Sequence, residues 1–430
     1  MNFDKLFNWL QNSLVPFMAK LSNQRHIKAV RNGLLSTIPV TFIGSIAIIL
    51  RYPPFNLDID NDFLFKFLLL WKKWSNANSE VIMKLFKVSI GFYGVFLVSA
   101  VSYNLAKEYK LKEIFIAKVA IINFLLVSVN FDGNLLRIDS LNGESLFTAI
   151  IIAILTVEII KKVESFEVEL STSIDIPPAT IKIFTSLVPF LSSVLIFYFL
   201  DLGFHSMIGI SIPEVISGFF NPIVKMVDTP IGVFFFGMLV QLLWFTGIHG
   251  VITVGAFLRP ILEYNWMVNI ALYLSGQEMS RIFTIQFLNF YMLIGGSGAT
   301  LALSFLCWRS SSKQLKKIGK ISLIQSLFNV DESLIFASPL VLNKIMFLPF
   351  VFVQPIIGVV AYFVISHGFV QKNFVRVPWI MPAPLGAFLS TLDWKSVILV
   401  IFLIFLSGIL YYPFFKKYEN YLINKQKKLH

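Results

Sequence analysis

Two adjacent carboxylates lie in an otherwise apolar stretch of the sequence, Phe328-Asn329-Val330-Asp331-Glu332-Ser333-Leu334-Ile335-Phe336. In a membrane chain a buried ionisable group is costly, and it usually faces a pathway or a partner. A carboxylate in such a place can accept hydrogen bonds from neighbouring hydroxyl groups of a ligand. We therefore predict that Glu332 is the centre of a substrate site. A structural pair with a lysine or with a helix N-terminus is the alternative, and Asp331 is the weaker candidate because two adjacent residues do not easily face one ligand.

A histidine between two glycines is the second candidate, in Trp244-Phe245-Thr246-Gly247-Ile248-His249-Gly250. The glycines suggest an opened helix end, and imidazole can donate, accept or take up a proton near neutral pH. A purely structural role for His249 is an equally good interpretation. Trp244 and Trp379 could stack on a ligand ring, although tryptophans near the ends of spans are usually interfacial anchors. Asn329 completes the set of predicted substrate-binding residues.

The composition indicates a membrane protein that would hold these residues at bilayer depth. Of 430 residues, 56% are hydrophobic and 14% are charged, whereas soluble domains carry about a quarter charged residues. The formal net charge of +12 agrees better with basic loops on the cytoplasmic side than with nucleic-acid binding. No Walker motif and no metal-spaced cluster of His and Cys is present in the sequence, so we expect no metal and no cofactor. Cys307 is predicted to be a small buried residue.

The apolar runs predict an all-α polytopic fold with about ten transmembrane helices. The predicted spans are 29–50, 85–105, 114–129, 146–160, 179–202, 231–245, 250–275, 283–307, 345–365 and 396–412. The basic segments between them place both termini in the cytoplasm. The span at 250–275 contains Arg259, Glu263 and Asn265, so it is predicted to be irregular and partly polar. Gly295-Gly296-Ser297-Gly298 is interpreted as a site of close helix packing within a span.

Two further segments do not suit ordinary spans. The segment 321–340 is short and polar and follows a basic loop at 313–320, and the segment 377–391 holds three prolines and a glycine. A regular helix is not expected over the latter. Both are predicted to be re-entrant hairpins, the first entering from inside and the second from outside. Two broken segments that approach from opposite faces point to a transport site.

The same patterns predict the domain organisation. Residues 1–28 form an interfacial amphipathic helix, and 29–226 form an N-terminal membrane half, for which the family resemblance given below implies a role in scaffolding and oligomerisation. A polar linker at 164–178 lies within that half, and the pieces at 63–71 and 208–226 are predicted to be amphipathic. Residues 227–415 form the transport half, with its hairpins near 321–340 and 377–391, and 416–430 form a basic cytoplasmic tail.

Several short segments occur in an order and spacing that resemble a known family. They are Gln24-Arg25-His26, Arg31-Asn32-Gly33, Ser36-Thr37-Ile38-Pro39, Leu146-Phe147-Thr148-Ala149-Ile150, Pro177-Pro178-Ala179, Gly247-Ile248-His249-Gly250, Phe328-Asn329-Val330-Asp331-Glu332, Val377-Pro378-Trp379 and Pro384-Leu385-Gly386-Ala387-Phe388. Over nearly its full length the chain resembles the membrane-embedded IIC component of the bacterial phosphoenolpyruvate-dependent sugar phosphotransferase system. The resemblance is to the lactose, cellobiose and diacetylchitobiose type.

The resemblance implies a function and a mechanism. A homodimer in the lipid of the cell membrane would carry a β-linked disaccharide such as cellobiose, lactose or diacetylchitobiose by an elevator-like movement. A phosphocysteine on a separate cytoplasmic IIB protein, itself served by IIA, would phosphorylate the C6 hydroxyl. Any enzymatic activity would therefore need that separate chain. Glu332 and His249 fall on the family's sugar-contacting glutamate and histidine, so the implied catalytic roles are contact near the reacting hydroxyl for Glu332 and holding the sugar or assisting proton removal for His249.

The chain departs from the family pattern at two places. Asp331-Glu332-Ser333 stands where Asn-Glu-Pro is usual, and Met381-Pro382-Ala383-Pro384 stands where Thr-Pro-Pro-Pro is commoner. These changes leave the identity of the sugar open. They also leave two alternatives to a phosphorylating permease, namely a proton-coupled secondary sugar transporter and a divergent sugar-binding membrane protein without turnover.

Overall fold

The computed structural model describes residues 3–54, 62–132, 135–137, 139–165, 178–207, 209–337 and 340–427. Its contacts divide the chain into two units. The N-terminal unit comprises Asn23–Gly44 and Lys84–Ile223. The C-terminal unit comprises Met1–Ser22, Ser45–Met83 and Val224–His430, so it also takes in the start of the chain. Most of the predicted linker lies outside the described residues, which omit 166–177.

The N-terminal unit consists of helices with one small hairpin. Its elements are α3 (Arg25–Ser36), α4 (Ile38–Arg51), α6 (Ser79–Val88), a 3-10 turn (Ile90–Phe92), α7 (Tyr93–Tyr109), α8 (Glu113–Ser128), β1 (Asn130–Asp132), β2 (Leu135–Arg137), two 3-10 turns (Asp139–Leu141 and Gly143–Ser145), α9 (Leu146–Glu164), α10 (Pro178–Met207) and α11 (Ile212–Val227). The chain of α4, α6 and α11 belongs partly to this unit and partly to the other. The strands pair antiparallel, with Phe131 opposite Leu136.

Small and branched residues build the core of this unit where α3, α7, α8 and α9 meet. The fully buried members are Ala29, Leu105, Ala106, Ile116, Val119, Val157 and Ile160. Gly33 lets α3 approach α7 closely, because a Cβ added there would lie 2.6 Å from Val101 Cγ2. An ordinary carbon contact needs about 3.5 Å or more, so Gly33 in the Arg31-Asn32-Gly33 segment is required by packing.

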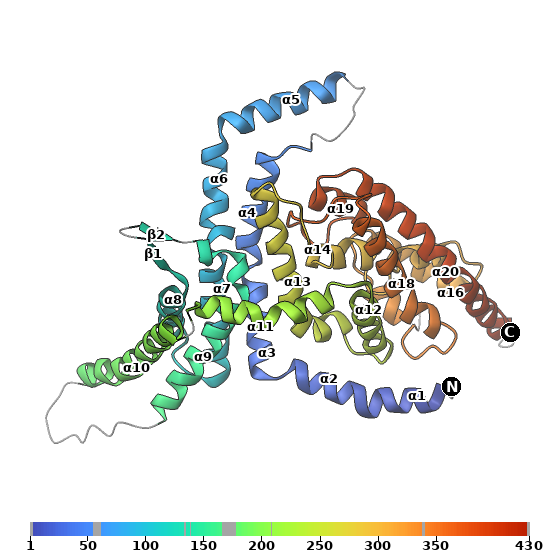
Figure 1. The fold of residues 1–430 in the computed structure, drawn as a ribbon. Coiled ribbons are helices and arrows are strands. Elements are labelled where there is room, and N and C mark those ends of the chain that lie inside the picture. The colour runs from blue at the N-terminus through green and yellow to red at the C-terminus, as the bar shows by residue number, and fades with distance from the viewer. Residues whose placement is uncertain are drawn as a thin grey trace. The chain divides into compact units, whose positions relative to one another are not determined.

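The C-terminal unit holds the remaining elements and all of the predicted site residues. They are α1 (Phe3–Trp9), a π-helical turn (Leu10–Leu14), α2 (Val15–Ser22), α5 (Asp62–Ala77), α12 (Pro230–Phe245), α13 (Gly250–Leu274), α14 (Ile285–Phe287), a π-helical turn (Leu288–Met292), α15 (Leu301–Trp308), α16 (Lys313–Leu327), α17 (Glu332–Ala337), α18 (Phe347–Ser366), α19 (Ala383–Thr391) and α20 (Lys395–Lys427). Helix α18 packs against α12 and α20, and α20 also packs against α15 and α19 (Figure 1).

The prediction of an irregular span at 250–275 is wrong, because α13 is one continuous helix. Its polar residues find partners inside the unit. Glu263, which is buried, accepts hydrogen bonds from Arg259 at 3.2 Å and from Arg376. Asn265 donates to the Phe283 carbonyl at 2.9 Å, and Asn269 donates to the carbonyls of Arg281 and Asn373. Paired in this way, buried polar groups do not require the helix to break.

The irregular backbone lies instead in the next predicted span, 283–307. There the glycine segment Gly295-Gly296-Ser297-Gly298 separates a short helical stretch from α15, and its three glycines have φ angles of 80°, 106° and 84°. Our interpretation of these glycines as packing sites within a regular span was therefore wrong. Glycine is the residue that adopts positive φ without a steric cost, so the segment ends one helix before the next begins.

The two predicted hairpin segments are short helices joined to irregular backbone. Helix α16 already begins at Lys313, so the predicted basic loop at 313–320 is helical. A turn then leads to α17 at Glu332. In the second segment, residues 377–382 are irregular and Ala383–Thr391 is helical, so the expectation of no regular helix holds only before Ala383. Pro384 fits because it lies in the first turn of α19, where its missing N–H has no helical partner to lose.

Five helical stretches in the described residues are long and apolar enough to cross a membrane. They are Arg25–Arg51, Ser79–Tyr109, Leu187–Met207, Phe347–Ser366 and Lys395–Gln426. The pair Ile212–Val227 and Pro230–Phe245, bent by 78°, would make a sixth. The count of ten spans, the re-entrant character of the two hairpin segments and the orientation of the termini stay predictions. Helix α20 continues through most of the predicted tail, to Lys427.

Candidate functional site

All six predicted site residues line one cavity of about 340 Å³ in the C-terminal unit: Trp244, His249, Asn329, Asp331, Glu332 and Trp379. They come from the end of α12, the start of α13, the turn before α17 and the irregular segment before α19. Residues up to 135 positions apart in sequence, Trp244 and Trp379, therefore share one wall. Whether they bind a substrate stays a prediction.

Glu332 lines this cavity with an exposed side chain. It is the first residue of α17. Within the part of the chain that the structure describes, its carboxylate has neither a hydrogen-bond partner nor an ion pair. Of the two structural alternatives, the lysine pair is not observed among these residues, whereas the position at a helix N-terminus is, because Glu332 lies in the first turn of α17. A carboxylate with free acceptor positions in a cavity can bind hydroxyl groups of a ligand.

Asp331 has a different environment from its neighbour. Its side chain is buried, and the Thr300 hydroxyl donates to its Oδ2 at 3.4 Å. A Cβ placed on Gly296 would overlap the Asp331 side chain. Asp331 therefore packs under the glycine segment, and only the edge of its side chain reaches the cavity wall.

Asn329 joins three segments at the tip of the first hairpin. Its Oδ1 accepts from the Gly295 N–H at 3.0 Å, and its Nδ2 donates to the carbonyls of Trp379 and Met381, both at 2.8 Å. The residue has a φ of 60°, a conformation in which asparagine is favoured over most residues. Because both amide hydrogens are used, the Asn329 side chain has no donor left for the predicted contact with substrate. Its observed role is to hold the segments of the cavity wall together.

His249 caps α13 and leaves one ring nitrogen for the cavity. Its Nδ1 accepts from the Ile252 N–H at 3.3 Å, so the neutral ring carries its proton on Nε2. That nitrogen is then a hydrogen-bond donor. The Trp244 ring lies 4.3 Å from the His249 ring, centroid to centroid. The buried Trp244 N–H has no hydrogen-bond partner among the described residues.

Neighbouring helices fix the glycine segment that forms part of the wall. Gln354 of α18 accepts from the Gly298 N–H at 2.7 Å, and Tyr411 of α20 donates to the Gly298 carbonyl at 2.7 Å. Gln241 of α12 donates to the same Gln354 oxygen. A bent backbone that would be strained on its own is thus held by buried hydrogen bonds from two helices, and a third helix orients the Gln354 side chain.

Sequence reasoning missed five polar or small lining residues: Gly255, Arg259, Asn289, Gly296 and Ser297. For Arg259 a signal was present, because His249, Ile252, Gly255, Arg259 and Leu262 recur at intervals of three and four residues, which places them on one helix face. Asn289, Gly296 and Ser297 lie in the segment that was read as a regular span. No group of three or more His, Cys, Asp or Glu side chains in the described residues could hold a metal ion.

The Asn329 bridge can be tested by Asn329→Ala. The change removes three hydrogen bonds and leaves the Gly295 N–H without its partner, which should lower the stability of the folded protein by about 1–3 kcal/mol. The measurement is the thermal unfolding midpoint in detergent, with Asn78→Ala as the control, since Asn78 makes one hydrogen bond within its own helical turn. Equal midpoints for the two variants would show that the bridge contributes nothing.

Comparison with known proteins identifies the chain's family. Residues 31–353, about three quarters of the chain, match the phosphotransferase system EIIC family. The chain belongs to this family. It is therefore the membrane-embedded EIIC component, or sugar permease, of a phosphotransferase system, and it is a multi-pass protein of the plasma membrane.

Individual EIIC proteins match over almost the whole chain. The oligo-beta-mannoside-specific EIIC component of Bacillus subtilis (strain 168) is 27% identical over 98% of this chain and 96% of its own length. The lactose-specific EIICB component of Staphylococcus aureus is 29% identical over 96% of this chain and 72% of its own length. The crystal structure of ChbC, the IIC component of the N,N'-diacetylchitobiose-specific phosphotransferase system, superposes with a TM-score of 0.86 at 27% identity, covering 97% of this chain and 99% of ChbC.

Proposed function

We propose that this EIIC protein carries a β-linked disaccharide such as cellobiose, lactose or diacetylchitobiose across the plasma membrane, with coupled phosphorylation at the C6 hydroxyl. The phosphoryl donor would be a phosphocysteine on a separate IIB protein, which IIA in turn phosphorylates. The observation that carries the proposal is Glu332, a carboxylate with no ion pair among the described residues, in the same cavity as His249. The names of the three similar proteins support a β-linked sugar.

The cavity supplies complementary groups for such a sugar. The Glu332 carboxylate accepts a hydrogen bond from the reacting hydroxyl, while Nε2 of His249 donates one to a sugar oxygen. Trp379, which is 52% exposed, offers a ring face on which the apolar side of a sugar can stack. Because its Nδ1 is occupied by a backbone N–H, His249 suits holding the sugar better than removing its proton.

The phosphoryl transfer can be written with these groups. The C6 oxygen attacks phosphorus, the bond between phosphorus and the Sγ of the IIB cysteine breaks, and the hydroxyl proton passes to Glu332 as general base. The products are the sugar 6-phosphate and the IIB thiolate. Cys307 of this chain does not suit the donor role, because it is buried in α15 and a thiol must be reachable to exchange a phosphoryl group.

We further propose that the protein is a homodimer and that the sugar crosses by an elevator-like movement of the unit that contains the cavity. Support for the movement comes from the division of the chain into two units, with every cavity-lining residue in one of them. Both termini would lie in the cytoplasm, in line with the basic residues near each end.

A transport experiment in sealed vesicles tests the proposed function. Uptake should require phosphorylated IIB and should deliver sugar phosphate to the lumen. A proton-coupled transporter, the second candidate, would accumulate free sugar when only a proton gradient is applied, and Asp331 gives it a second carboxylate at the cavity. Sugar binding without uptake under either condition would indicate a protein that has lost turnover.

A further inference from the structure

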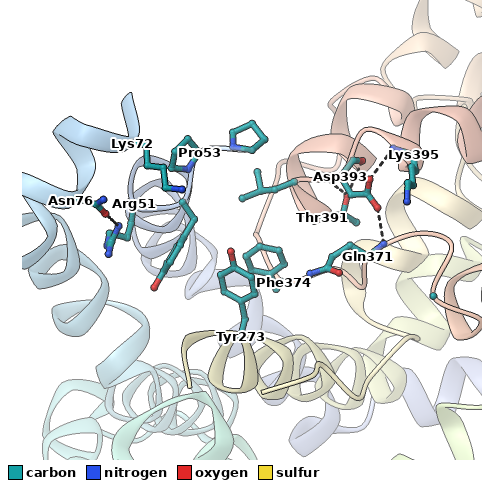
Figure 2. A pocket seen from close by; sticks show the side chains of 14 residues that line it. Arg51, Pro53, Lys72, Asn76, Tyr273, Gln371, Phe374, Thr391, Asp393 and Lys395 are labelled. Atoms are coloured by element: carbon teal, nitrogen blue, oxygen red, sulfur yellow. Dashed lines mark hydrogen bonds between the residues drawn. The ribbon is translucent and has the colours of Figure 1, made fainter. Parts of the chain in front are cut away.

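A second cavity of about 410 Å³ lies in the C-terminal unit and shares no lining residue with the first. We call it the arm cavity. One wall carries Arg51 from the end of α4 with Lys72 and Asn76 from α5, and the opposite wall carries Gln371, Asp393 and Lys395 (Figure 2). The rings of Tyr273 and Phe374 lie between the two walls in this view.

Positive charge outweighs negative charge among the described lining residues of the arm cavity. Asp393, the one carboxylate among the described lining residues, accepts from the backbone N–H groups of Gln371 and Lys395, each at 3.0 Å. The Asn76 oxygen accepts from Arg51 at 2.8 Å. The cations Arg51, Lys72 and Lys395 outnumber this carboxylate in the part of the lining that the structure describes. An excess of cations favours an anion over a neutral sugar as the occupant of this cavity.

The arginine of this cavity is held by neutral groups. Arg51 donates to Asn76 and to the Ser75 hydroxyl at 3.3 Å, and its guanidinium lies 5.1 Å from the centre of the Tyr52 ring. Within the described residues neither Arg51 nor Lys395 forms an ion pair with a carboxylate. An oriented guanidinium without an anionic partner is well suited to bind phosphate through two parallel hydrogen bonds.

Helix α5 indicates the depth at which this cavity lies. Apart from Lys72 and Asn76, it exposes a run of large apolar side chains, namely Phe63, Phe65, Phe67, Leu70 and Trp74. A helix with basic residues among exposed aromatic and aliphatic side chains lies in the membrane interface, at the level of the lipid headgroups. The cations of the arm cavity are thereby brought to the depth at which lipid phosphates occur.

We propose that the arm cavity binds the phosphodiester headgroup of an anionic phospholipid. Arg51 and Lys395 reach the phosphate from opposite walls, and Tyr52 and Tyr273, whose rings meet edge to face at 5.1 Å, pack against the glycerol part. A bound headgroup would link the end of α4 and α5 to the start of α20. The proposal concerns a lipid and does not depend on which sugar is transported.

Native mass spectrometry of the full chain with equal amounts of phosphatidylglycerol and phosphatidylcholine tests this site. The unaltered protein should retain phosphatidylglycerol in preference. Arg51→Gln and Lys395→Gln should each weaken that retention about tenfold, since each removes one charge-assisted contact. Lys73→Gln is the matched control, because Lys73 is exposed on the same helix next to Lys72 and does not line the cavity.

Three outcomes would overturn the proposal. Equal weakening by Lys73→Gln would show non-specific attraction of anionic lipid, and unchanged retention in both Arg51→Gln and Lys395→Gln would show no role for the cavity. Release of phosphatidylglycerol by millimolar inorganic phosphate would show a site for free phosphate. Sugar binding by each variant, measured in parallel, should equal that of the unaltered protein. A loss of sugar binding in these variants would reveal damage to the fold. If the proposed sugar function is wrong, the lipid measurement is unaffected, because it does not involve sugar.

Discussion

Glu332→Gln is expected to weaken sugar binding roughly 10- to 100-fold, because a hydrogen bond to a charged group contributes about 1.5–3 kcal/mol. The substitution keeps the size of the side chain and removes its charge. Phosphorylation by the IIB partner should fall further than binding does, since an amide cannot take the hydroxyl proton. Calorimetric titration of cellobiose, lactose and diacetylchitobiose into purified protein measures the first effect, and product formation measures the second.

The adjacent residue supplies the control for this experiment. Asp331→Asn makes the same chemical change one position earlier, at a side chain that is buried beneath Gly296 and bonded to Thr300. Sugar affinity should therefore change less than about threefold, which corresponds to well under 1 kcal/mol. Unchanged affinity in Glu332→Gln would remove Glu332 from the site. A larger loss in Asp331→Asn than in Glu332→Gln would reverse the assignment of the two carboxylates.

Gly296→Ala is expected to destabilise the folded protein by roughly 2–6 kcal/mol, the sum of backbone strain and of an overfilled site. The φ of 106° at Gly296 is strained for any residue with a Cβ, and that Cβ would overlap the Asp331 side chain. The thermal unfolding midpoint should fall sharply, and sugar binding should be lost with it, because the segment forms part of the cavity wall.

A second glycine that lines the same cavity, Gly255, supplies the control. It tests whether any glycine-to-alanine change in this cavity lowers stability, or only the change at Gly296. Gly255 lies in α13, and an added Cβ there would meet nothing within 4 Å. Gly255→Ala should therefore leave the unfolding midpoint unchanged or raise it, since alanine favours helix over glycine by about 1 kcal/mol. In Gly296→Ala with Asp331→Ala, the overlap with the carboxyl group disappears, whereas the Cβ of residue 331, at 2.5 Å, and the backbone strain remain. Only a small part of the stability should therefore return. A normal midpoint for Gly296→Ala alone would contradict the described geometry.

The sequence predicted the family, and it singled out residues that line one cavity, but it predicted the path of the backbone less well. Glu332 and His249 stood out because polar groups in apolar surroundings need a reason to be there. The same reasoning wrongly predicted an irregular helix at 250–275. There Glu263 forms ion pairs with Arg259 and Arg376 and needs no ligand. The positions of such partners, more than 100 residues away in the case of Arg376, depend on the tertiary fold and cannot be seen in a local pattern.

The glycine segment shows a second limit of the sequence. A group of glycines in an apolar run fits close helix packing and helix interruption equally well. The choice between them depends on Asn329, Gln354 and Tyr411, which supply hydrogen bonds to Gly295 and Gly298. These donors and acceptors come from three other parts of the chain, so the break could be recognised only after the helices had been placed.

The bridge made by Asn329 limits how a molecule can get into and out of the cavity. Moving the tip of the first hairpin outward, like a hinged flap, would break all three bonds of one amide at once. The hairpin tip would therefore resist opening, and the glycine segment at 295–298 would have to move with it. We therefore expect passage on the side of the exposed Ile252 and Trp379 side chains, with the joined segments acting as a preformed cradle whose shape is the same whether it is empty or loaded.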